Sequence, residues 1–477
     1  MRRAAARAAL FGLCLLGAVC RERRAPAPSP RASAPPGSGH NVVLVTIDTL
    51  RADHLGAYGY ARPTSPRIDG LARSATLFDK AYTFWPKTRG SMAVMLTGRR
   101  PSRNGYGKSH PLLLDFNPTL ASVLKDAGYV TAAVVDNPNL AALNGYAKGF
   151  DTYRETWEEK DLVTETDRAR AITDAGIAFL RAAPPDRPFF LWLHYVNPHA
   201  PYTPPPPFDT AFLDAQAAKG PALALVPGFH GGIPRRWAVR GQARLGYYVA
   251  QYDGEIAAVD QEVGRVLDAL GASAAQGKTV LLLTSDHGES LGEHDYYFDH
   301  GEDLFEPSLA VPLIVSVPGG KAGRRSRVFA STLDVVPTVL DAVKVSYPPE
   351  LAGISLLGEA LGRTSRGRER LFAQNDRNLA AAWDRRFKTI ATPDKDALRY
   401  ELYDRSADPA ESRDLTKAHP VDAQAQRAEL DRFLEDTEKE WVQTRRLLSG
   451  AAGEAKLSAE ACAKLKTLGY VVDGCRQ

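Results

Sequence analysis

A hydroxyl between two cations is the first chemical feature of the chain. Within the stretch 85–98, Thr88 lies between Lys87 and Arg89, and a short apolar run of helical type follows until Gly98. A threonine just before a helix faces unpaired backbone N–H groups and the positive end of the helix dipole. Such a place can hold an anionic ester beside a hydroxyl able to attack it. The simpler interpretation is a threonine that caps a helix.

Acidic residues and a histidine follow two apolar runs that are far apart in the sequence. Residues 41–47 and 279–285 have the apolar, partly β-branched character of buried parallel strands; Asp48 follows the first run, and Asp286 and His287 follow the second. Ligands gather at the carboxyl ends of such strands. Carboxylates and an imidazole there predict a divalent-cation site, which would activate a bound hydroxyl and stabilise charge on an oxyanion. Capping of the next turn is the alternative role of Asp48.

Strands and helices must alternate along the chain to bring these residues together. The apolar patterns predict strands at 41–47, 130–135, 189–195, 279–285 and 313–317, and helices at 65–75, 118–127, 162–182 and 245–270. This order predicts an α/β fold with a mostly parallel central sheet sandwiched by helices. The proline-rich residues 201–232 show no periodicity, and we expect a long loop at the site.

The pattern changes in the C-terminal part of the chain. Strands are expected near 369–374, 387–392 and 399–403, followed by a helix over 421–446. They predict a small antiparallel subdomain beside the main sheet. The resulting division is a leader (1–20), a tether rich in Pro, Ala and Ser (21–39), a catalytic domain (40–345), a C-terminal subdomain with its helix (346–446) and a tail (447–477).

The positive charge of the chain is concentrated in its first residues. The net charge is +4, but residues 1–24 contain six arginines and one glutamate, a net of +5, so the remainder carries about −1. Without a basic stripe, nucleic acid is not an expected partner. The apolar run 8–19 is too short to span a bilayer and predicts an export signal of a bacterial envelope protein, periplasmic or membrane-anchored. The leader resembles a lipoprotein signal with Cys20 as the lipid-modified residue, although Val19 departs from the small residue usual before it.

Only four cysteines occur in the chain, and two of them lie in the leader. The other two, Cys462 and Cys475, lie close together in the tail, and an oxidising compartment would allow them to pair. We predict a Cys462–Cys475 disulfide. No cysteine occurs between residues 21 and 461.

Several motifs, in order along the chain, resemble the sulfatase branch of the alkaline phosphatase superfamily. The motifs are Val45–Gly56, Leu96–Gly98, Phe189–Tyr202, Thr284–His294, Val311–Pro318 and Tyr400–Glu411. The resemblance implies that Asp48, Asp286 and His287 bind a divalent metal, with Ca, Mn, Zn and Mg not distinguished. It also implies that the nucleophile lies on the segment 83–98.

The nucleophile segment departs from the sulfatase pattern. Counting back from Leu96-Thr97-Gly98 places Thr88 where sulfatases carry the Cys or Ser that becomes formylglycine, and Gly90 and Met92 replace the motif's proline and arginine. A threonine there resembles instead the phosphatase, phosphodiesterase and phosphoglycerol- or phosphoethanolamine-transferase branches. In those branches the threonine forms a phospho-enzyme and binds a metal with an Asp/Asp/His set, which corresponds here to Asp48, Thr88, Asp286 and His287.

Other polar residues match positions that touch substrate in the family. His199 matches one that contacts the oxyanion or protonates the leaving group, and His300 lies where relatives place a substrate-binding lysine or histidine. The candidate catalytic residues are Thr88, His199, His300 and Arg89. The candidate substrate contacts are Lys87, Asn137, Lys108 and His110. His194 is alternatively a packed core histidine, and His294 either loop structure or a partner of a ligand.

Three functions follow from these features. The first is a metal-dependent hydrolase or transferase of phosphate esters or diesters that acts through a covalent Thr88 intermediate. The second is a sulfate-ester hydrolase without formylglycine, and the third is a non-catalytic binder of anionic glycans or lipid head groups. The second hydroxyl of formylglycine expels sulfate, whereas a threonine ester needs an activated water, which phosphorus accepts more readily; threonine therefore favours phosphate. The intact metal set argues against the third function.

Overall fold

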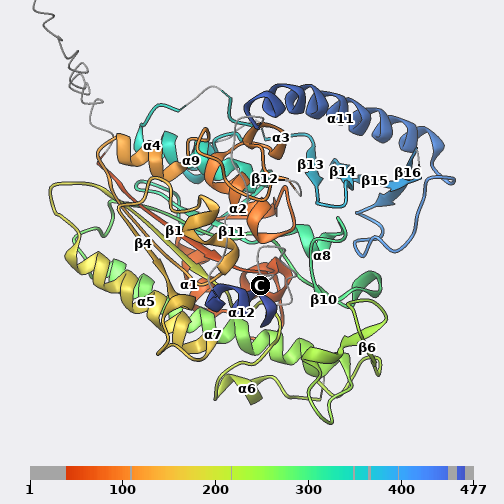
Figure 1. Ribbon diagram of the computed structural model, residues 1–477, viewed down its shortest axis with the longest axis horizontal. Coiled ribbons are helices and arrows are strands. Elements are labelled where there is room, and N and C mark those ends of the chain that lie inside the picture. Colours follow the sequence, from red (N-terminus) through yellow and green to blue (C-terminus); the bar gives the residue numbers. More distant parts are fainter. Residues whose placement is uncertain are drawn as a thin grey trace, which may run out of the picture.

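A mixed eight-stranded sheet forms the centre of the molecule (Figure 1). The computed structural model describes residues 39–107, 110–215, 217–347, 350–363, 367–395, 397–448 and 459–467. The predicted leader, the lipid anchor at Cys20 and nearly all of the tether therefore lie outside the described residues. Among the described helices, none combines the length and apolar character needed to cross a membrane.

All strands of the central sheet except β11 run in one direction. In spatial order the strands are β12 (Arg324–Ser331), β2 (Thr76–Tyr82), β11 (Leu313–Ser316), β8 (Thr279–Ser285), β1 (Asn41–Ile47), β5 (Phe189–Tyr195), β3 (Val130–Val135) and β4 (Thr152–Glu155). The carboxyl ends of β8, β1, β5 and β3 therefore meet at one edge of the sheet.

Helices cover both faces of this sheet (Figure 1). Alternate residues of β1 point to opposite faces, so Val42 and Leu44 join one buried cluster and Val43 and Val45 join the other. Both faces are apolar, which explains the continuous apolar run in the sequence. One face is covered by α2 (Thr88–Thr97), α4 (Leu120–Asp126) and α9 (Val335–Val343), and the other by α1 (Pro66–Ser74), α5 (Glu165–Ala182) and α7 (Leu245–Gly271).

The C-terminal part forms a second, antiparallel sheet covered by a long helix. Its strands are β13 (Leu371–Gln374), β14 (Ala380–Trp383), β15 (Phe387–Asp394) and β16 (Ala397–Asp404), and the helix is α11 (Pro420–Leu448). The C-terminal half of α11 reaches back to α3 (Pro101–Asn104), where Thr444 donates a hydrogen bond to the Ser102 carbonyl.

Short elements connect these parts. They are α6 (Phe208–Ala211), α8 (Glu306–Leu309), α10 (Leu357–Ala360) and α12 (Ala459–Thr467); β6 (Ala224–Val226), β7 (Gly232–Pro234), β9 (Ser290–Leu291) and β10 (Tyr297–Asp299); and the 3₁₀ turns η1 (Ala52–His54), η2 (Gly56–Tyr58), η3 (Pro138–Leu140), η4 (Ala142–Asn144), η5 (Thr156–Glu158), η6 (Arg235–Trp237), η7 (Glu293–Asp295) and η8 (Thr332–Asp334). The helix α12, dark blue in Figure 1, packs against η3 and η5 of the main domain.

The predicted fold class is confirmed. The strands expected at 41–47, 130–135, 189–195 and 279–285 have those bounds, and the four predicted helices of the main domain end within three residues of the observed ones. The sequence reasoning missed β2, β4, β12 and β14. β12 and β4 are the edge strands of the large sheet, where charged and exposed residues interrupt the apolar pattern.

Candidate active site

Three predicted metal ligands converge at the carboxyl edge of the sheet. β1 and β8 are adjacent and parallel, with Ile47 opposite Ser285, so the residues after both strands come together. Asp48, Asp286 and His287 each offer one ligand atom, and these atoms lie within 4.8 Å of one another. All three side chains are completely buried.

The donor atoms of these residues have the arrangement that a cation requires. Asp48 Oδ1 and Asp286 Oδ2 are buried and have no hydrogen-bond partner among the described residues. His287 Nε2 lies 3.7 Å from the first and 3.4 Å from the second. His287 Nδ1–H donates to the Gly288 carbonyl at 2.9 Å, which leaves Nε2 as the unprotonated nitrogen. The residues therefore fit a divalent cation.

The electrostatics of the cluster also favour a bound divalent cation. Burial alone would raise the pKa of Asp48, but the surrounding imidazoles of His194, His199 and His287 lower it to about 2. Burial and the charge of Asp48 hold the pKa of Asp286 well above its usual value, and burial lowers the pKa of His287 to about 4. Two buried carboxylates so close together repel each other, and a divalent cation would remove this repulsion.

Thr88 lies next to this cluster. Its Oγ1 is 3.3 Å from His287 Nε2, and the side chain is fully buried. The residue in the N-cap position of α2 is Lys87, so Thr88 is the first residue of the helix rather than its cap. Ser91 anchors the helix to the Asp/Asp/His cluster, because its hydroxyl donates to the Asp286 carbonyl at 2.6 Å.

The glycine that replaces the family's proline has a packing role here. The indole of Trp85 lies against Gly90, where an added Cβ would come within 2.2 Å of Trp85 Cδ1. Trp85 is itself buried. The glycine therefore lets the tryptophan before Thr88 pack directly on the first turn of α2.

Two asparagines after β3 link the strand end to Asp48 and Arg89. Asn137 Nδ2 donates to Asp48 Oδ2 at 2.6 Å, and Asn137 Oδ1 accepts from the Asn139 backbone N–H at 3.0 Å. Asn139 Oδ1 accepts from Arg89 Nε at 3.0 Å. The structure therefore places Asn137 behind Asp48, a predicted metal ligand, and the contact of Asn137 with substrate stays a prediction. Asn139, which sequence reasoning missed, orients the guanidinium of Arg89 beside Thr88.

A buried histidine pair and a glutamate lie beside His287. The ring of His300 lies 4.1 Å from that of His287 and 5.1 Å from that of His199, centroid to centroid. His300 Nδ1 is 3.2 Å from Glu289 Oε1, and His199 Nδ1–H donates to the Ala200 carbonyl at 2.6 Å. Burial and the charges of His287, His199 and Lys87 hold the pKa of His300 well below its usual value. Sequence reasoning missed Glu289, although it stands two residues after His287.

The remaining candidates have different positions. The Lys87 side chain lies next to Gly301, where an added Cβ would be 3.3 Å from Lys87 Cδ. His110 is exposed and pairs through its backbone with Gly107, and Lys108 lies outside the described residues. His194 is buried on β5, with Nδ1 2.8 Å from Thr46 Oγ1 and Nε2 3.8 Å from Asp48 Oδ2. His294 is exposed and stacks on Phe305.

The predicted disulfide falls partly outside the described residues. Cys462 on α12 is disulfide-bonded. Its predicted partner, Cys475, lies outside the described residues, so the pairing stays a prediction.

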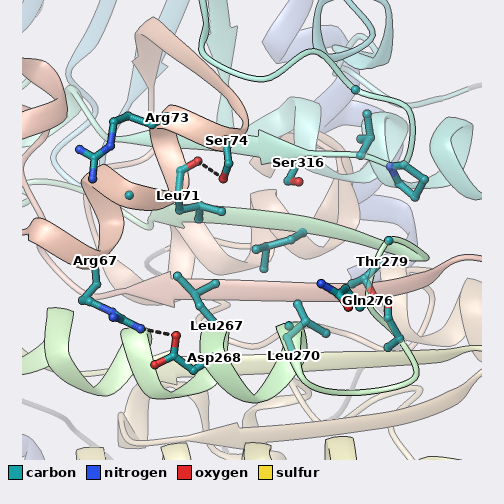
Figure 2. Close-up of a pocket in the computed structure, with 18 of the residues that line it drawn as sticks. Arg67, Leu71, Arg73, Ser74, Leu267, Asp268, Leu270, Gln276, Thr279 and Ser316 are labelled. Carbon is teal, nitrogen blue, oxygen red and sulfur yellow. Dashed lines mark hydrogen bonds and ion pairs between the residues drawn. The ribbon is translucent and has the colours of Figure 1, made fainter.

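A cavity of about 670 Å³ lies at the opposite edge of the sheet. Figure 2 shows Arg67 of α1 paired with Asp268 of α7 at this cavity, with Thr279 nearby. Thr279 is the first of the seven residues of β8, whereas Asp286 follows its last residue. At about 3.3 Å per residue the cavity is roughly 20 Å from the metal cluster, so it is not part of the candidate site.

The fold and the site together define a class of protein. A hydroxyl at the start of a helix, facing an Asp/Asp/His cluster at the carboxyl edge of a mostly parallel sheet, is the arrangement of an ester hydrolase of the alkaline phosphatase superfamily. Comparison with known families agrees with this class. The sulfatase family model matches residues 40–345, and a model of the C-terminal region of N-sulphoglucosamine sulphohydrolase matches residues 292–440. The chain belongs to the sulfatase family.

Individual relatives extend this result. The chain is 27% identical to an arylsulfatase of Clostridium perfringens, over 66% of this chain and 77% of that protein. It is 24% identical to an N-acetylglucosamine-6-O-sulfatase of Bacteroides thetaiotaomicron, over 84% of this chain and 86% of the relative. The fold is similar to that of a phosphonate monoester hydrolase of Agrobacterium radiobacter, with a TM-score of 0.70, 22% identity and coverage of 84% of this chain and 96% of that one.

Proposed function

We propose that this enzyme hydrolyses sulfate esters of a carbohydrate, with Thr88 as the nucleophile and a divalent cation held by Asp48, Asp286 and His287. The observation that carries the proposal is the position of Thr88 Oγ1, 3.3 Å from His287 Nε2 beside three buried donor atoms. The choice of ester is supported by relatives whose names are those of an arylsulfatase and a sugar sulfatase. This preference for sulfate esters differs from the preference that the threonine alone suggests, which is for phosphate esters.

The first step of the reaction replaces one ester bond by another. When bound, the cation would lower the pKa of the Thr88 hydroxyl and stabilise charge on the ester oxygens. Thr88 Oγ forms a bond to sulfur as the bond from sulfur to the sugar oxygen breaks, and the sugar leaves as an alcohol. His199 Nε2 accepts the proton of the Thr88 hydroxyl and passes it to this oxygen, because Nδ1–H is held by the Ala200 carbonyl and Nε2 is the nitrogen able to transfer a proton.

The second step regenerates the enzyme. Water attacks the sulfur of the threonine sulfate, the bond to Thr88 Oγ breaks, and hydrogen sulfate leaves as the hydroxyl is restored. A threonine ester needs an activated water for this step, and we assign that task to His300. Glu289, 3.2 Å from His300 Nδ1, orients the ring toward the cluster.

The second candidate is hydrolysis of phosphate esters by the same residues. The observation that favours it is the hydroxyl of Thr88 itself, because a threonine phosphate is more readily attacked by water than a threonine sulfate.

Assays of wild type and Thr88→Ala on an aryl sulfate, an aryl phosphate and a phosphodiester, each with Ca²⁺ or Mn²⁺ and after chelation, test the proposal. We expect turnover of the sulfate that requires the metal, and a fall in kcat of about 10³-fold or more in the variant. Thr97→Ala is the control, because Thr97 is a buried threonine of the same helix whose hydroxyl bonds to the Ala93 carbonyl.

Each alternative outcome has a distinct meaning. Sulfate turnover that survives Thr88→Ala refutes the nucleophile. Turnover of phosphate esters alone supports the second candidate. Failure to turn over any ester with metal present supports a binding protein.

A further inference from the structure

The helix α12 packs on the part of the main domain that carries Asn137 and Asn139. Ala461, Lys464 and Leu465 are buried, and the helix contacts η3 and η5. η3 begins at Pro138, directly after Asn137, the residue that donates to Asp48. The helix therefore lies one layer behind the candidate metal site, although about 320 residues of chain separate α12 from η3.

A line of ion pairs connects α12 to this layer. Lys464 Nζ is 2.5 Å from Glu165 Oε1 at the start of α5. Glu165 Oε1 is 3.7 Å from Arg168 Nη2, and Arg168 Nε is 3.0 Å from Asp136 Oδ2. At most 13% of any of these four side chains is exposed, so water screens their charges only weakly.

Asp136 connects these ion pairs to the candidate site. Its backbone N–H donates to the His194 carbonyl at 3.2 Å, and its Oδ1 accepts from Thr156 Oγ1 at 2.8 Å. The next residue, Asn137, holds Asp48. The position of Asp136 therefore determines where the amide of Asn137 meets the metal ligand.

A second buried acid, Glu255, interacts electrostatically with Lys464. Glu255 of α7 accepts hydrogen bonds from Asn197 Nδ2 at 2.5 Å and from the Thr203 backbone at 2.8 Å, which brace the loop that carries His199. The charges of both Glu165 and Lys464 act on Glu255. Asp136, Glu165 and Glu255 thus form an acidic cluster with two neighbouring cations, Arg168 and Lys464.

We propose that Lys464 is a positioning residue of the active site, because it supplies the charge that holds this acidic cluster and so keeps Asn137 in place behind Asp48. The inference rests on the proposed function, which makes Asp48 a metal ligand. With methionine at 464 the cluster retains only Arg168, and a second cation no longer offsets the repulsion between the carboxylates of Asp136 and Glu165. The strand end that carries Asn137 then moves, and Asp48 loses its fixed orientation.

The test compares full-length wild type with Lys464→Met, Lys464→Arg and Lys466→Met. Lys466 is the matched control, because it is an exposed lysine of the same helix. Circular dichroism checks folding, the rise in melting temperature on titration with Mn²⁺ or Ca²⁺ gives the metal affinity, and kcat and KM are measured for an aryl sulfate.

We expect Lys464→Met to bind the metal about tenfold more weakly and to lose kcat by a similar factor. Lys464→Arg should stay within about twofold of wild type, since it keeps the charge, and Lys466→Met should be unchanged.

Metal affinity and kcat of Lys464→Met that equal those of wild type overturn the inference and leave the proposed function standing. Equal losses in Lys464→Met and Lys466→Met also overturn it, because a general weakening of α12 then explains both. Wild-type protein that binds neither ion overturns the inference together with the proposed function.

Discussion

The carboxylates of Asp48 and Asp286 repel each other when no cation lies between them. Both are fully buried, and each has one oxygen without a hydrogen-bond partner among the described residues. Such a pair is unfavourable without a cation and favourable with one. The same residues should therefore weaken the fold and strengthen metal binding.

The variant Asp286→Asn tests whether this pair lowers the stability of the metal-free fold while it provides the metal binding. We expect the variant to melt at a higher temperature than wild type in the presence of a chelator, because one of the two charges is removed. Addition of Mn²⁺ or Ca²⁺ should stabilise wild type by about 2.7 kcal/mol at one hundred times the dissociation constant, and should leave the variant unchanged. Differential scanning calorimetry with and without metal measures both effects. A variant that is less stable than chelated wild type would contradict this account.

A buried carboxylate of the long helix α11 accepts hydrogen bonds from three residues of the main domain. Glu440 accepts from Arg100, from Ser102 Oγ at 2.5 Å and from Arg103 Nε at 2.9 Å, and its side chain is 9% exposed. Arg100 to Arg103 belong to the segment that follows α2, the helix of Thr88. The contact thus joins the C-terminal subdomain to the segment next to the helix of Thr88, the proposed nucleophile.

Glu440→Ala should release this end of α11. We expect a loss of about 2 kcal/mol in the free energy of unfolding, because the arginines are left without their acceptor, and faster proteolysis near the end of α11. Glu438→Ala is the control on the same helix, since Glu438 pairs with Arg445 at the exposed surface, where a pair contributes almost nothing. Urea denaturation and limited proteolysis measure the two effects, and equal losses in both variants would refute the anchor.

The stability of the whole protein should depend on pH through Glu255. Burial, followed by the charge of Glu165, raises the pKa of Glu255 from 4.5 to about 8 in the folded state. Between these values the unfolded chain loses the proton while the folded protein keeps it, so stability falls as pH rises and levels off above about pH 8. Below pH 4.5 both states are protonated and the residue contributes no pH dependence.

Glu255→Gln should remove this part of the pH dependence. We expect the melting temperature of the variant, relative to wild type, to rise by about 4 °C between pH 5 and pH 8. Thermal melts of both proteins at matched ionic strength measure the difference. A difference that stays constant over this range would show that Glu255 is ionised in the folded protein.

The sheet could be predicted from the sequence where strands are buried on both faces. β1, β5 and β8 are apolar on both faces along most of their length, and their bounds agree with the apolar runs. β2 was missed because Asp79 and Lys80 interrupt its pattern, and β12 because Arg324 and Arg325 do. Asp79 and Arg325 pair with each other, a compensation between two strands that a local pattern cannot reveal.

The site could be predicted only as far as its residues follow strands or belong to motifs. Asp48 and Asp286 are directly after strands, so their meeting followed from parallel pairing. Asn139, Glu289 and Lys464 act through contacts with residues distant in the sequence, and each type is common on protein surfaces. Their roles depend on how distant segments of the chain come together at the carboxyl ends of the strands, and the spacing of residues along the sequence does not reveal this.

The position of Lys464 has a consequence for the order in which the protein is made. The candidate site begins at residue 48, yet the cation that braces it lies on residue 464, and the Lys464–Glu165 contact spans 299 residues. During synthesis, all three proposed metal ligands emerge before this contact can form. A nascent or prematurely terminated chain would therefore carry the nucleophile without a rigid site. On our inference, the enzyme reaches full hydrolytic activity only after α12 has been translated and has packed against η3 and η5.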